Sequence, residues 1–197
     1  MITDINQLDF SKKYSYADYL TWQFKERVEL IKGGVFKMSP APNLYHQRVS
    51  GRLFRLFSNF LVGSKCEIFA APFDVRFSKK GMDDKIVFDI VQPDLCVVCD
   101  PSKLDIKGCN GAPDLIVEIL SKSTGRKDLH EKYQLYESNG VGEYWIVHPI
   151  EQTLQINTLS DEGKYIPGKL LTCGEMAISQ VIDGFEFDLD DIFDAEN

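Results

Sequence analysis

One short stretch of the chain, residues 111–121, constrains the fold more than any other. It reads Gly-Ala-Pro-Asp-Leu-Ile-Val-Glu-Ile-Leu-Ser. A continuous apolar run that follows Gly and Pro is typical of a strand buried on both faces, in a sheet covered by helices. Glu118 lies within this run, and a buried ionised carboxylate is unfavourable unless it is paired, hydrogen-bonded or bound to a metal. The sequence therefore predicts that Glu118 belongs either to a structural ion pair or to a functional site.

Length and composition indicate one globular domain that spans residues 1–197. A chain of 197 residues is long enough for a single domain with a substantial core. No apolar run reaches membrane-spanning length, and residues 1–13 contain no apolar signal-peptide core, so we expect a cytoplasmic protein without membrane contact. The net charge of −8 argues against unspecific coating of nucleic acid, but it leaves room for a local basic cleft.

The five cysteines are predicted to be reduced thiols. They are Cys66, Cys96, Cys99, Cys109 and Cys173, and three of them fall in or beside apolar, strand-like segments. Cys96 and Cys99 have the two-residue spacing found in zinc sites, which is the alternative. On a strand, however, they would face opposite ways, and no second Cys or His pair with zinc-finger spacing follows.

The first half of the chain predicts a hairpin followed by a helix. Residues 28–38 read as a β-hairpin whose turn lies at residues 32–34. Asn43 can cap a helix that runs to about Leu61. Apolar residues recur at helical spacing on the inward face of this helix, and His46 extends that face by one turn. The apolar positions of this face are Val49, Leu53, Leu56, Phe57 and Phe60.

Three strands, a second helix and a further strand are predicted next. The strands lie at residues 66–77, 86–99 and 112–120, and the last one at 143–147. The helix is entered through residues 123–127 and ends at about Ser138. The order helix, three strands, helix, strand is one α/β layer unit, with the hairpin before it and β additions after it.

Two Pro-Asp dipeptides supply possible partners for Glu118, at Asp94 and Asp114. Along one strand, Asp114 and Glu118 point to the same face but stand roughly 13 Å apart at about 3.3 Å per residue, too far for one metal ion. Asp94 on a neighbouring strand can share a coordination sphere with Glu118, because adjacent strands are about 4.8 Å apart. We therefore pair Asp94 with Glu118 and interpret Asp114 as a strand-entry residue, although an Asp after Pro is more often a turn former.

A lysine on an apolar helix face is the next candidate site residue. The inward stripe of the second helix contains, at i, i+3, i+4 and i+7, Leu129, Lys132, Tyr133 and Tyr136. Lys132 either snorkels outwards or pairs with a buried carboxylate, where it can position a water molecule and stabilise a pentavalent phosphate. Glu29 and His46 are weaker candidates, since solvent exposure explains Glu29 and a core position explains a lone His.

Taken in order, these motifs resemble the Uma-two family, which is assigned to the PD-(D/E)XK restriction-endonuclease-like superfamily. The resemblance covers nearly the whole chain. It rests on Glu29-Leu30-Ile31, residues 38–42, His46-Gln47, Gln92-Pro93-Asp94, residues 113–121, Asp128, Lys132, Tyr136 and Glu143-Tyr144-Trp145. It implies a restriction-endonuclease-like α/β core of helix, three strands, helix and strand, in agreement with the predicted order of elements.

The resemblance also implies a site. In the wider superfamily an Asp on one strand and an Asp or Glu on the next bind magnesium, and a Lys two residues further on completes the site. Leu120 occupies that position here, so the lysine is expected from the following helix, as Lys132, with Lys122 as the rival. Glu29 and His46 match family positions and are expected to be auxiliary to the metal or the water.

The sequence thus predicts a Mg²⁺- or Mn²⁺-dependent endonuclease that hydrolyses phosphodiester bonds of DNA. Asp94 and Glu118 are the expected metal ligands, and Lys132 is expected to orient water and stabilise charge. A non-catalytic nuclease-fold binding or assembly module is the alternative, favoured by the net negative charge and the missing strand lysine. A nuclease that acts on RNA is not distinguished by sequence, and a homodimer formed through the β-rich C-terminal part is a further expectation.

Overall fold

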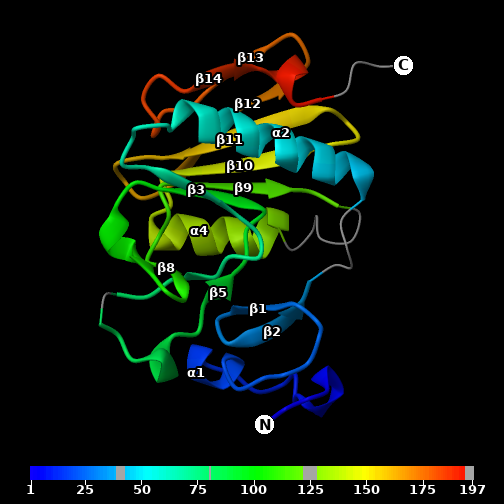
Figure 1. The fold of residues 1–197 in the computed structure, drawn as a ribbon, viewed down its shortest axis with the longest axis vertical. Helices are drawn as coiled ribbons and strands as arrows, with labels where there is room; N and C mark the ends of the chain where they lie inside the picture. Colours follow the sequence, from blue (N-terminus) through cyan, green and yellow to red (C-terminus); the bar gives the residue numbers. More distant parts are fainter. Residues whose placement is uncertain (39–42, 80, 122–127, 194–197) are drawn as a thin grey trace.

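The computed structural model describes residues 1–38, 43–79, 81–121 and 128–193. Figure 1 shows a central sheet between two helices, α2 on one face and α4 on the other, with smaller β elements and the N-terminal segment beyond α4. No helix in the described part of the chain is both long and apolar enough to span a membrane.

The central sheet has six strands in the order β12-β11-β10-β9-β6-β3. Their bounds are β3 Glu67–Ala70, β6 Leu95–Val98, β9 Leu115–Ile119, β10 Glu143–His148, β11 Thr153–Leu159 and β12 Tyr165–Thr172. β9 and β10 are parallel, whereas the other neighbours are antiparallel. The carboxyl ends of β9 and β10 therefore meet at one edge of the sheet.

A second, more irregular sheet follows the order β2-β1-β5-β4-β8-β7. Its strands are β1 Val28–Ile31, β2 Gly34–Lys37, β4 Val75–Arg76, β5 Ile90–Val91, β7 Leu104–Asp105 and β8 Gly108–Asn110. The predicted hairpin is β1 and β2, and its turn consists of Lys32 and Gly33, whose φ angles of 52° and 78° are left-handed. β13 Met176–Ile178 and β14 Glu186–Asp188 form a separate antiparallel pair.

Two of the predicted strands are wrong as continuous elements. Residues 66–77 divide into β3 and β4, and residues 86–99 divide into β5 and β6, so that each pair contributes to both sheets. Pro72 and Pro93 lie at the two breaks. Proline has no N–H for a sheet ladder, which explains why pairing stops at both positions. The segment between β6 and β9, for which no strand is predicted, contains the short strands β7 and β8.

The helix α2, Leu44–Phe60, begins and ends within one residue of the prediction. The Asn43 side chain accepts the His46 N–H at 3.0 Å, so the predicted cap is present. Three residues of its inward face, Val49, Leu53 and Phe57, are buried in a core cluster with Leu115, Val117 and Ile119 of β9. Phe60, in contrast, is 45% exposed, and its ring packs edge-on against Phe185.

The second helix has an irregular start. A π-helical turn, Asp128–Lys132, precedes α4, Tyr133–Asn139, and Gly140 ends α4 in a left-handed conformation. The wider π turn shifts the helix face, so Leu129 is 46% exposed and not part of the inward stripe, whereas Leu135 is buried. Residues 123–127, where the helix was expected to begin, lie outside the described residues.

The remaining helical segments are short. α1, Tyr16–Tyr19, begins with a capping box in which Ser15 and Asp18 exchange hydrogen bonds. The 3-10 turns are Ile5–Gln7, Asp84–Ile86, Pro101–Lys103 and Leu189–Asp191.

The prediction that every cysteine is reduced is wrong for two of them. Cys66 and Cys99 form a disulfide. They flank the register pair Glu67 and Val98 on the antiparallel strands β3 and β6, which brings them opposite each other. The remaining cysteines are free thiols, with Cys96 and Cys109 buried and Cys173 exposed. No sequence pattern indicated the disulfide, because the register that places Cys66 opposite Cys99 depends on which strands pair.

A buried carboxylate fastens the end of the sheet to the C-terminal segment. Glu143 is fully buried, and its Oε2 accepts hydrogen bonds from Trp145 Nε1 at 3.0 Å and from Ser179 Oγ at 2.8 Å. Its Oε1 accepts the backbone N–H of Gln180 at 2.6 Å. All three donors would lose their partner if this carboxylate were removed.

We expect Glu143→Ala to lower the free energy of unfolding by about 3 kcal/mol, because it leaves buried donors unsatisfied. Chemical denaturation followed by circular dichroism measures this change. Glu186→Ala, which removes an exposed carboxylate from β14, is the matched control and should leave stability nearly unchanged. Equal effects of the two substitutions would contradict a structural role for Glu143.

Candidate active site

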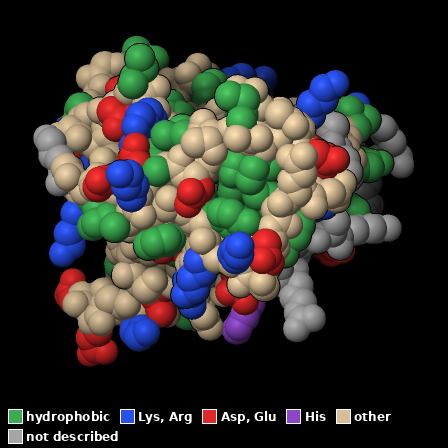
Figure 2. Space-filling model, turned by 90° about the horizontal axis from the view of Figure 1, so that it is seen from below, with side chains coloured by type: hydrophobic (Ala, Val, Ile, Leu, Met, Phe, Trp, Pro, Cys, Tyr) green, Lys and Arg blue, Asp and Glu red, His purple; other side chains and the backbone are tan. Residues whose placement is uncertain are grey.

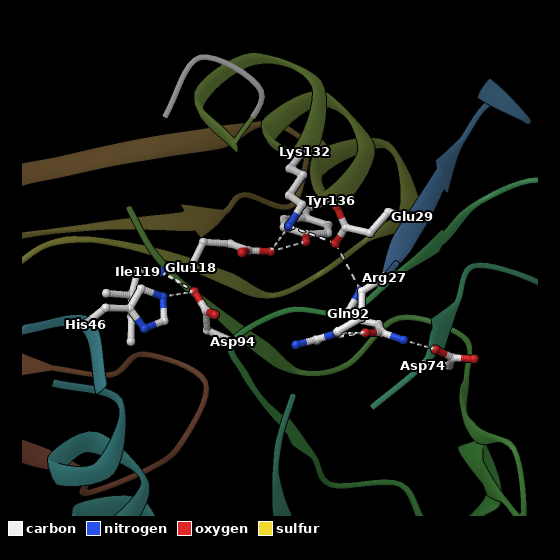
Figure 3. A network of polar contacts seen from close by, with 10 residues as sticks. All are labelled: Arg27, Glu29, His46, Asp74, Gln92, Asp94, Glu118, Ile119, Lys132 and Tyr136. Carbon is white, nitrogen blue, oxygen red and sulfur yellow. Dashed lines mark hydrogen bonds and ion pairs between the residues drawn. The ribbon is translucent and has the colours of Figure 1, made fainter. Parts of the chain in front are cut away.

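A buried lysine lies between two buried carboxylates. Lys132 Nζ is 2.7 Å from Glu118 Oε1 and 3.0 Å from Glu29 Oε1 (Figure 3). Lys132 and Glu118 are each 3% exposed, and Glu29 is 1% exposed. Lys132 therefore does not snorkel outwards, and the simpler interpretation of Glu29 as solvent-exposed is wrong. Lys122, the rival lysine, lies outside the described residues.

Three separate elements supply this ion triad. Glu29 comes from β1 of the second sheet, Glu118 from β9 of the central sheet, and Lys132 from the π turn before α4. Successive side chains of a strand alternate between faces, so Glu118 shares the α4 face with Ile116, which packs in the cluster of Leu135. The apolar packing of α4 on this face brings the ammonium group to the carboxylate.

Tyr136 is a site contact that the sequence analysis did not assign. Its hydroxyl donates to Glu118 Oε1 at 2.6 Å, one helical turn after Lys132. Burial raises the pKa of Tyr136 well above its ordinary value, and the negative charges of Glu118 and Glu29 act in the same direction. The phenol therefore stays protonated and remains a hydrogen-bond donor to this carboxylate. Its spacing of four residues from Lys132 was the available signal.

Glu29 is also connected to the segment that leads to Asp94. Its Oε1 accepts the backbone N–H of Gln92 at 3.0 Å. The Gln92 side chain accepts from Arg27 through Nε at 3.0 Å and Nη2 at 2.7 Å, and it donates to Asp74 at 2.8 Å (Figure 3). Because these amide contacts fix Gln92, they fix the backbone two residues before Asp94. Nothing in the local sequence pattern indicated this network.

The Asp94 carboxylate contacts the backbone of β9 next to Glu118. Its Oδ2 accepts the Ile119 N–H at 2.7 Å and is 3.2 Å from His46 Nε2. Antiparallel pairing of Leu95 with Val117 places Asp94, directly before β6, opposite Glu118 of β9. The Asp94 side chain is 23% exposed, so it reaches solvent at the margin of the buried triad.

Asp114 occupies a different position. Its carboxylate accepts the backbone N–H of Cys99 at 2.7 Å, at the opposite end of β9 from Glu118. The structure therefore brings Asp94, and not Asp114, next to the residues around Glu118.

His46, on α2, contacts the partly exposed Asp94. The histidine is 7% exposed, and its Nδ1 has no hydrogen-bond partner among the described residues. When Nε2 carries the proton and donates to Asp94, Nδ1 is left with a lone pair and no unsatisfied N–H. This tautomer makes His46 a donor that orients the Asp94 carboxylate.

The two carboxylates fit a hard divalent cation. Mg²⁺ and Mn²⁺ favour carboxylate oxygens, and Mg²⁺ commonly binds one or two carboxylates together with water and substrate phosphate. Among the side chains that the structure describes, no three His, Cys, Asp or Glu residues are grouped as a complete metal site. Asp94 and Glu118 are therefore the residues that could contribute carboxylate oxygens to an ion that retains water.

Comparison with known proteins identifies the family and the fold. The model of the Uma2 family, described as "Putative restriction endonuclease", matches residues 16–190. The "Uncharacterized protein slr1290" of Synechocystis is 28% identical over 157 residues, which is 78% of each chain. A crystal structure from Anabaena variabilis, titled a "putative nuclease belonging to DUF820", aligns with a TM-score of 0.66.

That alignment covers 91% of this chain and 97% of the Anabaena chain at 16% identity, so it shows the fold. The fold is the predicted restriction-endonuclease-like α/β core. Because the family model extends over most of the sequence, this chain belongs to the Uma2 family, the restriction-endonuclease-like family that the sequence motifs resemble.

Proposed function

We propose that this protein is a metal-dependent endonuclease that hydrolyses phosphodiester bonds of DNA with Mg²⁺ or Mn²⁺. One observation supports this most strongly. The buried ammonium of Lys132 contacts Glu118, and Asp94 reaches solvent on the neighbouring strand. Metal-assisted hydrolysis of a phosphodiester uses a positively charged side chain, two carboxylates and access to water.

In this proposal Asp94 and Glu118 hold the metal ion. A bound Mg²⁺ lowers the pKa of its water and offsets negative charge on the phosphate. The hydrogen bonds from His46 and the Ile119 N–H to Asp94 fix the orientation of that carboxylate. The donors Lys132 and Tyr136 do the same for Glu118.

Lys132 is the residue that orients water and stabilises charge on the phosphate. Its ammonium has three donors, and contact with Glu118 and Glu29 keeps two of them directed within the site. Glu29 acts as a secondary acid that positions Lys132. The Gln92 backbone contact holds Glu29 in turn, so positioning extends from the second sheet to the reacting group.

A non-catalytic module is the second candidate, and a specific observation favours it. A fully buried lysine that contacts two carboxylates is also what a purely structural ion network looks like. Leu120, where the wider superfamily has its lysine, agrees with this interpretation. The two candidates differ in metal binding and in cleavage.

The first test is cleavage of plasmid and single-stranded DNA, with RNA as a parallel substrate, in the presence of Mg²⁺ or Mn²⁺. We expect Glu118→Gln and Asp94→Asn each to reduce the rate by at least about 100-fold, and Lys132→Ala by a similar factor. Asp114→Asn, which changes the other Pro-Asp dipeptide, should retain activity. Wild-type activity in Lys132→Ala would disprove the mechanism.

Stability must be measured together with cleavage, because Lys132 pairs with two buried carboxylates. We expect Lys132→Met to lower the free energy of unfolding by about 3–5 kcal/mol, since it leaves Glu118 and Glu29 without this cation. Lys164→Met removes an exposed ion pair with Glu137 and should change stability by less than about 1 kcal/mol. Denaturant titration compares the two, and equal losses would argue against a strongly coupled triad.

Calorimetric titration with Mg²⁺ separates the two candidate functions. The metal-dependent nuclease should release or absorb heat on binding, and this heat should disappear in Glu118→Gln. Glu186→Gln is the control for a change of net charge. A wild-type protein that gives no binding heat, or the same heat in Glu118→Gln, would favour the non-catalytic module.

A further inference from the structure

An exposed arginine lies at the edge of the candidate active site, and the proposed mechanism does not use it. Arg27 directly precedes β1, and its carbonyl accepts the N–H of Met38 at 2.9 Å, so it continues the ladder of the β1–β2 hairpin. Residues two apart in an extended strand point to the same face, which places the Arg27 side chain on the face of Glu29. On that face Glu29 contacts Lys132. The strand therefore directs a guanidinium group to the side of the ion triad.

The side chain of Gln92 holds this guanidinium in one orientation. Gln92 Oε1 accepts from Arg27 Nε at 3.0 Å and from Nη2 at 2.7 Å. The other end of the amide is fixed as well, because Nε2 donates to Asp74 at 2.8 Å and to the Tyr19 hydroxyl at 3.3 Å. Gln92 is 8% exposed, whereas Arg27 is exposed. A buried amide thus anchors an arginine that reaches solvent.

The same glutamine lies close to two carboxylates of the site. Its backbone N–H donates to Glu29 at 3.0 Å, and Asp94 is two residues further along the chain. Two residues span at most about 7 Å, which limits the distance between the Cα atoms of Gln92 and Asp94. In Figure 3 the guanidinium end of Arg27 extends from Gln92 to the side on which Asp94 lies. Direct hydrogen bonds therefore join Arg27 to the segment that carries Asp94.

Arg27 retains donors for a further partner. A guanidinium has five N–H groups, and Gln92 accepts from only two of them. Within the described parts of the chain, Arg27 makes no ion pair with a carboxylate. Asp74 lies across the neutral Gln92 amide, and it accepts from the hydroxyls of Tyr16 and Tyr19 as well. The planar fork of Arg27 is therefore suited to phosphate oxygens, which it can bind in a bidentate manner.

The surface charge of the molecule makes such a fixed cation important. On the face in Figure 2, lysine and arginine side chains of the described residues are interspersed with aspartate and glutamate. The net charge of −8 repels a polyanion at long range. Binding of nucleic acid therefore depends on individual phosphate contacts, which fix the position of the backbone.

We propose that Arg27 binds a phosphate of the substrate backbone next to the scissile phosphate, and that Gln92 is the residue that positions it. A guanidinium that is already oriented loses little conformational freedom when it binds an anion. The inference rests on the proposed nuclease function. It adds a contact that recognises the backbone and is independent of the base sequence.

The first measurement is binding without cleavage. Fluorescence anisotropy follows labelled DNA and RNA oligonucleotides with the wild-type protein in EDTA, at several salt concentrations. We expect Arg27→Gln to weaken binding roughly five- to tenfold and to reduce the slope of log K against log salt by about one, the value for one phosphate contact. Arg27→Lys, which keeps the charge without the fork, should restore the slope but only part of the affinity.

Lys25→Gln is the matched control, because it removes an exposed positive charge two residues before Arg27. It should bind like the wild type, and thermal melting should show that all variants are folded. Equal binding by the wild type and Arg27→Gln, or the same loss in Lys25→Gln, would overturn the contact. A wild-type protein that binds neither DNA nor RNA would overturn it as well.

Gln92→Leu tests the positioning role. Without the amide, Arg27 keeps its charge but loses its fixed orientation, so binding should weaken about threefold or more while the salt slope stays near that of the wild type. In the Arg27→Gln background the same substitution should have no further effect on binding. An equal effect in both backgrounds would show that Gln92 does not act through Arg27.

A cleavage map locates the phosphate. Each DNA strand carries one methylphosphonate linkage, which removes the charge of a single phosphate, and Mn²⁺ starts the reaction. The wild type should avoid cuts that place the neutral linkage at one fixed position next to the cut, and Arg27→Gln should lose this avoidance. Avoidance that persists unchanged in Arg27→Gln would assign that phosphate to another residue and overturn the proposal.

The two assays separate this inference from the proposed function. Cleavage by the wild type together with unchanged binding in Arg27→Gln would leave the nuclease and remove the Arg27 contact. Salt-dependent binding that requires Arg27, in a protein that cleaves neither DNA nor RNA, would keep the phosphate contact and remove the hydrolytic function.

Discussion

The contact of Lys132 with Glu118 and Glu29 is the interaction on which the rest of the structure depends. Each of the three groups is almost completely buried, and an isolated charge in such a place would be strongly unfavourable. Mutual pairing at 2.7 and 3.0 Å, with Tyr136 as an additional donor, satisfies this requirement. Because the partners come from β1, β9 and the start of α4, one ion network fixes two sheets and a helix relative to each other.

This network also differs in exposure from the carboxylate next to it. Asp94 is partly exposed, whereas the triad beside it is almost completely buried. Electrostatic interactions within the buried triad are therefore strong, and the Asp94 carboxylate lies where the site meets solvent.

The local patterns were sufficient for the elements that local chemistry controls. Asn43 capped the predicted helix, and the left-handed turn at Lys32 and Gly33 closed the predicted hairpin. These outcomes depend on backbone propensity over a few residues. The position of Leu129 was missed, because a π turn altered the helical phase that a regular period assumes.

The sequence by itself determined that Glu118 is a carboxylate in a buried strand, that it needs a partner, and that the order of elements is helix, three strands, helix and strand. Only the tertiary structure determined which groups pair with the Glu118 carboxylate. Burial of Glu29, the donor Tyr136 and the disulfide of Cys66 with Cys99 all depend on contacts between distant segments. Such contacts follow from strand register and from the packing of one sheet against another, which no local pattern of residues encodes.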